Sequence, residues 1–182
     1  EQRSDHSRIR RFREDFRRTP MDEVGMIEFP IRILEQYQEA FSTQVDAEAI
    51  RKAAFKVVID YAHGHASTVL PRILGRLGIE AVSLNAYIDS LRGRGSEVGR
   101  GQVLEQLSSI VTTLRTDLGV AIDATGERLM VVDEKGGLWQ GAKLLVLFAT
   151  LVMRTHPGAM VAVPVNPPSM LVDLGKKHGA KV

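Results

Sequence analysis

The segment from Lys56 to Leu84 constrains the fold more than any other part of this sequence. Three consecutive β-branched residues, Val57-Val58-Ile59, predict a strand that is buried on both faces of a sheet. An apolar helical pattern follows and ends at Gly78, and a second apolar run occupies residues 81–84. A strand, a helix and a strand within about thirty residues indicate a βαβ unit with parallel strands. The chain is therefore expected to be an α/β protein.

The rest of the sequence continues this alternation. Further strands are predicted at 120–123, 129–133 and 159–165, and further helices at 30–41, 46–54, 104–117, 144–153 and 168–178. A tight turn after the second of these strands predicts a hairpin that reaches Trp139. The helix at 144–153 is apolar enough to require burial on most sides. Residues 85–101 are rich in Gly, Arg and Ser. This composition fits a mobile phosphate-binding loop or an exposed connector, and we favour the connector.

Composition and charge exclude several classes of protein. The chain has 182 residues, 44% of them hydrophobic, which is enough to form a buried core. The 24 Lys and Arg residues nearly balance 22 Asp and Glu residues, so the pI of 9.1 does not indicate a general polyanion binder. Absence of cysteine excludes disulfides and thiolate metal sites. Since no membrane-length apolar run or signal-peptide pattern occurs, we expect a cytoplasmic protein without a membrane partner.

The first part of the chain is rich in arginine, and its apolar residues Ile9, Phe12 and Phe16 have helical spacing. One interpretation is an arm that binds nucleic acid or phosphate. The other is an amphipathic helix whose apolar stripe docks on a neighbouring domain, while the arginines face water and pair with Glu14 and Asp15. We favour docking and expect no nucleic-acid partner, because no aromatic stacking platform accompanies this local charge.

The loop between the strands predicted at 120–123 and 129–133 is the best candidate for chemistry. It contains Asp123 and Thr125, then Glu127 and Arg128. Acidic side chains at alternate positions of a loop can converge on one hard cation, and a nearby arginine can hold a phosphate. The same residues can instead form a turn in which their side chains bond to backbone amides. On the residues alone, both interpretations stay open.

Several motifs recur here in the order and spacing of a known family. They are residues 56–64, 70–78, 119–136, 156–159 and 177–179. In these motifs the chain resembles the α-D-phosphohexomutases, which include phosphomannomutase and phosphoglucomutase. Residues 12–37 look more like bacterial proteins in which a mutase-like region follows a sugar-1-phosphate nucleotidyltransferase, described as mannose-1-phosphate guanylyltransferases.

The resemblance implies a three-layer α/β/α domain with a mixed, mainly parallel sheet, together with N-terminal helices. It divides the chain into a helical linker or docking segment at 1–50, a second mutase domain at 51–156 and the truncated start of a third α/β domain at 157–182. The partners it implies are a hexose phosphate, of mannose or glucose, and other domains of the same chain.

The resemblance also assigns roles to the acidic loop. In the family, three aspartates at alternate positions hold magnesium, and an arginine follows the third. Here Asp123 and Arg128 match, while Thr125 and Glu127 replace the second and third aspartates. The resemblance therefore implies a degenerate magnesium site at Asp123, Thr125 and Glu127, with Arg128 as the phosphate ligand. The family's reactive phosphoserine has no counterpart in these motifs, so we assign no catalytic residue.

The two replacements predict a weakened site. Thr125 removes one formal charge, and Glu127 moves its carboxylate outward by one methylene. Magnesium requires near-octahedral oxygen ligands at about 2.0–2.1 Å. We therefore expect weak magnesium binding and weak or no mutase activity in a domain attached to a mannose-1-phosphate guanylyltransferase-type domain. The alternative is the metal-binding domain of an active phosphohexomutase that interconverts hexose 6-phosphate and 1-phosphate.

Overall fold

The structure, a computed structural model, describes residues 19–89, 97–164 and 168–182. The chain divides into two compact units, Glu1–Ile33 and Leu34–Val182. The arginine-rich stretch lies outside the described residues. In the first unit, residues 19–33 contain a turn in which the Glu23 N–H donates to the Pro20 carbonyl at 3.0 Å. The apolar residues of this segment, Met26 and Phe29 among them, are exposed.

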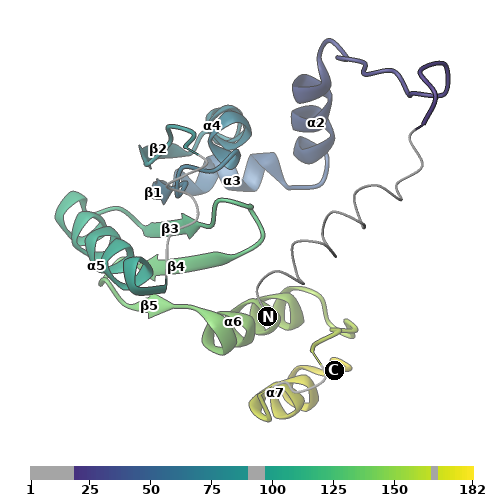
Figure 1. The fold of residues 1–182 in the computed structure, drawn as a ribbon. Helices are drawn as coiled ribbons and strands as arrows, with labels where there is room; N and C mark the ends of the chain where they lie inside the picture. The colour runs from purple at the N-terminus through teal and green to yellow at the C-terminus, as the bar shows by residue number, and fades with distance from the viewer. Residues whose placement is uncertain (1–18, 90–96, 165–167) are drawn as a thin grey trace, which may run out of the picture. The chain divides into compact units, whose positions relative to one another are not determined.

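The second unit contains a five-stranded mixed sheet (Figure 1). Its spatial order is β2-β1-β3-β4-β5. Strand β1 pairs in parallel with both β2 and β3, whereas β4 pairs antiparallel with β3 and β5. The strands are β1 (Lys56–Asp60), β2 (Glu80–Leu84), β3 (Leu118–Ile122), β4 (Leu129–Asp133) and β5 (Leu138–Trp139). The predicted parallel βαβ unit and the hairpin to Trp139 are confirmed.

Helices cover both faces of this sheet, as expected for a three-layer α/β/α fold (Figure 1). Side chains alternate along β1, so Val57 and Ile59 pack with α4 (Ala66–Arg76) on one face. On the other face, Val58 packs with α5 (Glu97–Leu114). The continuous β-branched run of β1 is thus explained by burial on both sides.

Two helices precede the sheet, α2 (Ile33–Ser42) and α3 (Ala47–Ala53). The prediction that the first begins at residue 30 was wrong, because Arg32 has a left-handed backbone, with φ of 76°, that a right-handed helix cannot include. The predicted cap of the second helix is confirmed, since Asp46 Oδ1 accepts a hydrogen bond of 2.9 Å from the Ala49 N–H.

Helix α5 begins earlier than predicted. Residues 97–101 are helical although they were assigned to an exposed connector, and residues 90–96 lie outside the described ranges. Glycine lowers helix propensity in this first part, but propensity is a weak preference that packing of the same helix on the sheet can override. Leu104, Leu107 and Val111 make that packing.

The C-terminal part consists of α6 (Gly141–Thr155) and α7 (Met170–His178), which share a small core around Met153 and Leu171. The expected burial of α6 on most sides was wrong, because α7 covers one side and leaves Phe148 46% exposed. None of the helices in the described ranges is both long and apolar enough to cross a membrane.

The strand predicted at 159–165 is also not formed over the described residues 159–164. Its only pairing there is a single parallel bridge between Met160 and Lys181. Two hydrogen bonds flank the bridge: Val161 N–H donates to the Lys181 carbonyl at 2.8 Å, and Lys181 N–H donates to the Ala159 carbonyl at 2.9 Å. A strand needs a partner over several residues, and the partner segment here pairs at one position.

Candidate functional site

The carboxyl ends of β1 and β3 mark the place where the chain changes direction across the sheet. From β1 the chain passes through α4 to β2 on one side, and α5 then returns it over the opposite face to β3 on the other side. Open α/β sheets bind ligands in the crevice outside the strand ends at such a switch point. Residues 61–65, after β1, and residues 123–128, after β3, therefore flank the expected ligand position.

Asp123 closes the loop formed by residues 123–128. Its Oδ1 accepts hydrogen bonds from the backbone N–H groups of Glu127, at 2.8 Å, and Arg128, at 3.1 Å. Its own N–H donates to the Arg128 carbonyl at 3.1 Å, and its carbonyl accepts from the Gly126 N–H at 2.9 Å. Gly126 has a φ of 77°, a left-handed conformation that glycine adopts without strain. The loop is therefore an ordered turn built around one carboxylate.

These hydrogen bonds also change the acidity of Asp123. Partial burial by itself raises the pKa of the Asp123 carboxyl, but hydrogen bonds from the backbone of Arg128 and Glu127 outweigh that effect. Smaller contributions come from the Thr125 side chain and the Gly126 backbone, and the net result is a lowered pKa. The carboxylate is thus held in its charged form at neutral pH.

The other predicted ligands lie on the surface of this turn. Thr125, Glu127 and Arg128 are exposed, whereas Asp123 is half-buried. Among the residues that the structure describes, no three His, Cys, Asp or Glu side chains gather as a metal site would require. Magnesium prefers several anionic oxygens. The turn offers the Asp123 carboxylate, which already accepts two N–H groups, the neutral Thr125 hydroxyl and the exposed Glu127 carboxylate. This set fits magnesium poorly.

A second polar cluster lies at the same edge and was missed by the sequence interpretation. Asp60, the last residue of β1, is 3% exposed and accepts a hydrogen bond of 2.7 Å from Asn85 Nδ2. Its other oxygen accepts from the Ala62 N–H at 2.8 Å. The available signal was a polar residue at the end of each of two neighbouring strands, because the carboxyl ends of parallel strands meet at one edge.

The loops after β1 and β2 are joined to each other by further bonds. The His63 N–H donates to the Asn85 carbonyl at 2.9 Å, and His63 Nδ1 lies 2.9 Å from the Tyr87 carbonyl oxygen. Ala62, His63 and Asn85 all have left-handed backbones, with φ of 45°, 59° and 48°. Asparagine and histidine adopt this conformation more readily than other residues, whereas alanine does so at a cost in strain. Such strain concentrates at functional sites.

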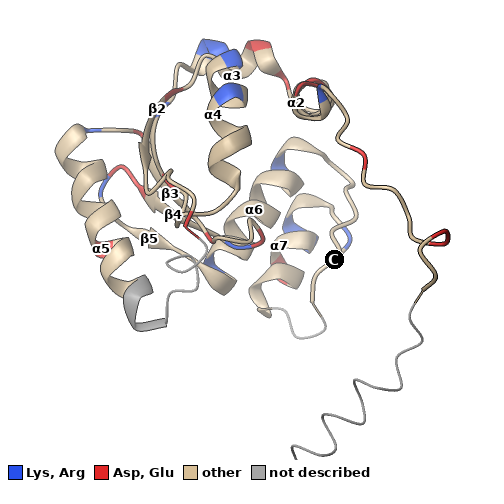
Figure 2. Ribbon diagram, turned by 45° about the horizontal axis from the view of Figure 1, so that its top comes forward, with Lys and Arg blue, Asp and Glu red and all other residues tan. Residues whose placement is uncertain are grey.

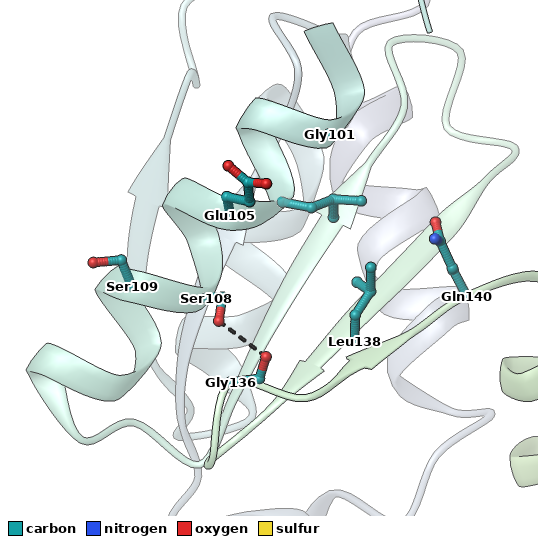
Figure 3. A pocket seen from close by; sticks show the side chains of 8 residues that line it. Gly101, Glu105, Ser108, Ser109, Gly136, Leu138 and Gln140 are labelled. Carbon is teal, nitrogen blue, oxygen red and sulfur yellow. Dashed lines mark hydrogen bonds between the residues drawn. The ribbon is translucent and has the colours of Figure 1, made fainter. Parts of the chain in front are cut away.

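A separate groove of about 660 Å³ lies between α5 and the β4–β5 hairpin (Figure 3). Glu105, Ser108 and Gln140 contribute polar groups to it, and Ser108 Oγ donates to the Gly136 carbonyl at 2.9 Å. Its described lining comes from α5, the hairpin and Gln140, the residue before α6, not from residues 123–128. Charges of both signs are interspersed over the described ribbon (Figure 2).

Comparison with known proteins identifies relatives of this region. A family model described as phosphoglucomutase/phosphomannomutase, alpha/beta/alpha domain II, matches residues 35–137. A phosphoglucomutase/phosphomannomutase of Thermococcus kodakarensis is 35% identical over 171 residues, which are 94% of this chain and 37% of that protein. A probable phosphoglucosamine mutase of Methanococcoides burtonii is 29% identical over 161 residues, covering 88% of this chain and 35% of that protein.

A solved structure shares the fold. A putative phosphomannomutase from Thermus thermophilus superimposes with a TM-score of 0.70 at 20% identity, covering 86% of this chain and 36% of that one. The chain thus spans little more than a third of the length of each of these three proteins.

Proposed function

Because the chain belongs to the phosphoglucomutase/phosphomannomutase family, we propose that it supplies the magnesium-loop domain of a protein that acts on hexose phosphates, with that loop degenerate. In this proposal residues 51–156 are the second mutase domain and residues 157–182 begin a third. The segment 1–50, whose described part contains helices from Ile33 onward, docks on another domain of the same chain. The observation that carries the proposal is the ordered turn at 123–128, which lies at the switch point of the sheet.

The roles within the turn follow from its charges. Arg128 is the last residue of the turn and is exposed, so its guanidinium can hold a phosphate group of mannose or glucose phosphate. Asp123 remains charged at neutral pH and offers one carboxylate to a cation. Thr125 adds only a neutral hydroxyl, and Glu127 carries its charge on a longer, exposed side chain. The turn accordingly binds magnesium weakly, and the domain has weak or no mutase activity in itself.

Closure of the turn by backbone bonds also supports this proposal. The Asp123 Oδ1 atom already accepts two backbone N–H groups, so hydrogen bonds within the chain hold the loop together. A domain in which the metal no longer organises the loop can keep its fold while losing the electrostatic stabilisation on which phosphoryl transfer depends. In the whole protein we place this domain in the cytoplasm, beside a mannose-1-phosphate guanylyltransferase-type domain. The resemblance of residues 12–37 to such proteins supports that attachment.

A mutase assay of the full-length protein tests the proposal. We expect little conversion of mannose 6-phosphate or glucose 6-phosphate to the 1-phosphate by the natural sequence. The double substitution Thr125→Asp, Glu127→Asp restores two aspartates, and one well-placed stabilising group contributes about 10²–10³ in rate. An increase of that order in the double variant supports a degenerate loop. High turnover by the unaltered protein contradicts it and favours the metal-binding domain of an active phosphohexomutase.

A further inference from the structure

We propose that Gly64 is a positioning residue for the turn at 123–128, an inference that rests on the proposed function of that turn. A Cβ built on Gly64 would lie 2.6 Å from both the Cα and the carbonyl oxygen of Ala124, and 2.9 Å from its carbonyl carbon. Real Cβ atoms essentially never approach other heavy atoms within 3.0 Å. The backbone of Gly64 therefore packs directly on the backbone beside Asp123.

The backbone conformation at residue 64 does not explain why this residue is a glycine. The described glycines with positive φ are at positions 78, 126, 136, 141, 158 and 179, and Gly64 is not among them. An L-residue could therefore adopt the backbone of Gly64 without strain. What excludes a side chain at this position is the approach of Ala124. The contact between two loops, one after β1 and one after β3, thus accounts for the residue.

Gly64 cannot easily move away from this contact. It is buried, its N–H donates to the Tyr61 carbonyl at 2.7 Å, and its carbonyl accepts from Ser67 Oγ at 2.9 Å at the start of α4. On the preceding side, the His63 N–H is bonded to the Asn85 carbonyl. A methyl group at residue 64 therefore pushes Ala124, because the segment that carries it is held on both sides.

Displacement of Ala124 changes the turn itself. Ala124 follows Asp123 directly, and the Asp123 carboxylate is the group that holds the N–H groups of Glu127 and Arg128. Moving Ala124 by a few tenths of an ångström or more also moves Asp123. The hydrogen bonds from the Glu127 and Arg128 N–H groups to the carboxylate then lengthen, and Arg128 shifts. Gly64 thus determines the position of Arg128, which holds the phosphate, without itself contacting the phosphate. The loop after β1 supports the turn.

Gly64→Ala in the full-length protein tests this, with Gly75→Ala as the matched control. Gly75 lies in α4, and a Cβ there meets nothing within 4 Å. We expect Gly64→Ala to shift the NMR amide signals of Glu127 and Arg128 and to speed their hydrogen exchange. We also expect it to weaken mannose 6-phosphate binding about tenfold or more, because small misplacements of a binding group are costly. The control should leave the amide signals and mannose 6-phosphate binding unchanged and should not speed the exchange.

The outcomes separate this inference from the proposed function. If the unaltered protein does not bind mannose 6-phosphate while Gly64→Ala still moves the Glu127 and Arg128 amides, the proposed function fails and the positioning role stands. If a folded Gly64→Ala protein leaves those amides and the binding unchanged, the positioning role is overturned. If the variant does not fold, the positioning role is tested instead by comparing hydrogen exchange of the Gly64, Glu127 and Arg128 amides in the unaltered protein. Common opening of the Gly64, Glu127 and Arg128 amides supports the inference, and independent opening overturns it.

Discussion

Asp60 and Asn85 are joined by a hydrogen bond of 2.7 Å from the side-chain amide Nδ2 to the carboxylate Oδ2. Asp60 ends β1 and is buried, whereas Asn85 directly follows β2. The bond therefore fastens the carboxyl ends of two neighbouring parallel strands, beside the loop that supports the turn at 123–128. It is a structural tie at the edge where this fold binds ligands.

Asn85→Gly should weaken this tie without straining the backbone. Asn85 has a φ of 48°, which glycine adopts freely, so the substitution removes the amide donor and leaves the conformation available. Leaving a buried acceptor unpaired costs about 1–3 kcal/mol. Urea denaturation should show a loss of that size in the free energy of unfolding. An unchanged midpoint would mean that the bond contributes nothing to stability.

Trp139→Phe should make the free energy of unfolding depend less on pH in the acid range. The Trp139 indole Nε1 donates to Asp133 Oδ2 at 2.8 Å, and this bond is the largest cause of the lowered pKa of Asp133. Backbone bonds from Gly137 and Lys135 and the charge of Lys143 lower the pKa further, while burial opposes them. An aspartate whose pKa is lowered by folding stabilises the fold at pH values above its ordinary pKa of about 3.9. That stabilisation is lost as the pH falls through the lowered pKa of the folded state.

Denaturant titrations of both proteins between neutral pH and pH about 3 measure this effect, since that window reaches below the ordinary aspartate pKa. The difference in unfolding free energy between the unaltered protein and Trp139→Phe should be constant at neutral pH and should narrow below the ordinary aspartate pKa. Phenylalanine keeps an aromatic ring under Lys143, whose Nζ lies 4.1 Å from the centre of the Trp139 ring. Packing losses are independent of pH. A difference in unfolding free energy that stays constant down to pH about 3 would therefore mean that the indole hydrogen bond does not lower the pKa of Asp133.

Gly119→Ala should disturb the packing of α5 on the sheet. A Cβ at Gly119 would lie 2.6 Å from Val111 Cγ2 and 3.1 Å from Leu107 Cγ, both in the buried core. Overpacking a core by a methyl group costs about 1–3 kcal/mol. Thermal and urea unfolding should both report the loss. As the matched control, Gly75→Ala on the exposed side of α4 should gain about 0.5–1 kcal/mol, the preference of a helix for alanine. Equal stability of the two variants would contradict this account of the packing.

The features predicted correctly from the sequence are those with local causes. The β-branched run at Val57-Val58-Ile59 identifies a strand covered on both faces, and Gly78 ends the helix after it with a left-handed φ of 71°. The hairpin after β4 follows from its turn residues, with Asp133 Oδ1 accepting from the Lys135 and Gly137 N–H groups. Such signals lie within a few residues of the structure they specify.

The features missed have non-local causes. Nothing near Gly64 in the sequence shows that Ala124 packs on it, because that contact joins segments sixty residues apart. The bond between Asp60 and Asn85 likewise depends on the strand order. Helicity at residues 97–101 depends on packing of the rest of α5 on the sheet, and the exposure of Phe148 depends on how much of α6 its neighbours cover. At the turn itself, the residue types were visible in the sequence, but the two N–H groups held by Asp123 were not.

Magnesium titration of the full-length protein by calorimetry tests the degenerate loop most directly. The account predicts millimolar or weaker affinity in the unaltered protein, because Asp123 is the only half-buried carboxylate of the turn and Thr125 and Glu127 replace two aspartates. It also predicts tighter binding in the Thr125→Asp, Glu127→Asp variant. Micromolar affinity in the unaltered protein would contradict the central claim.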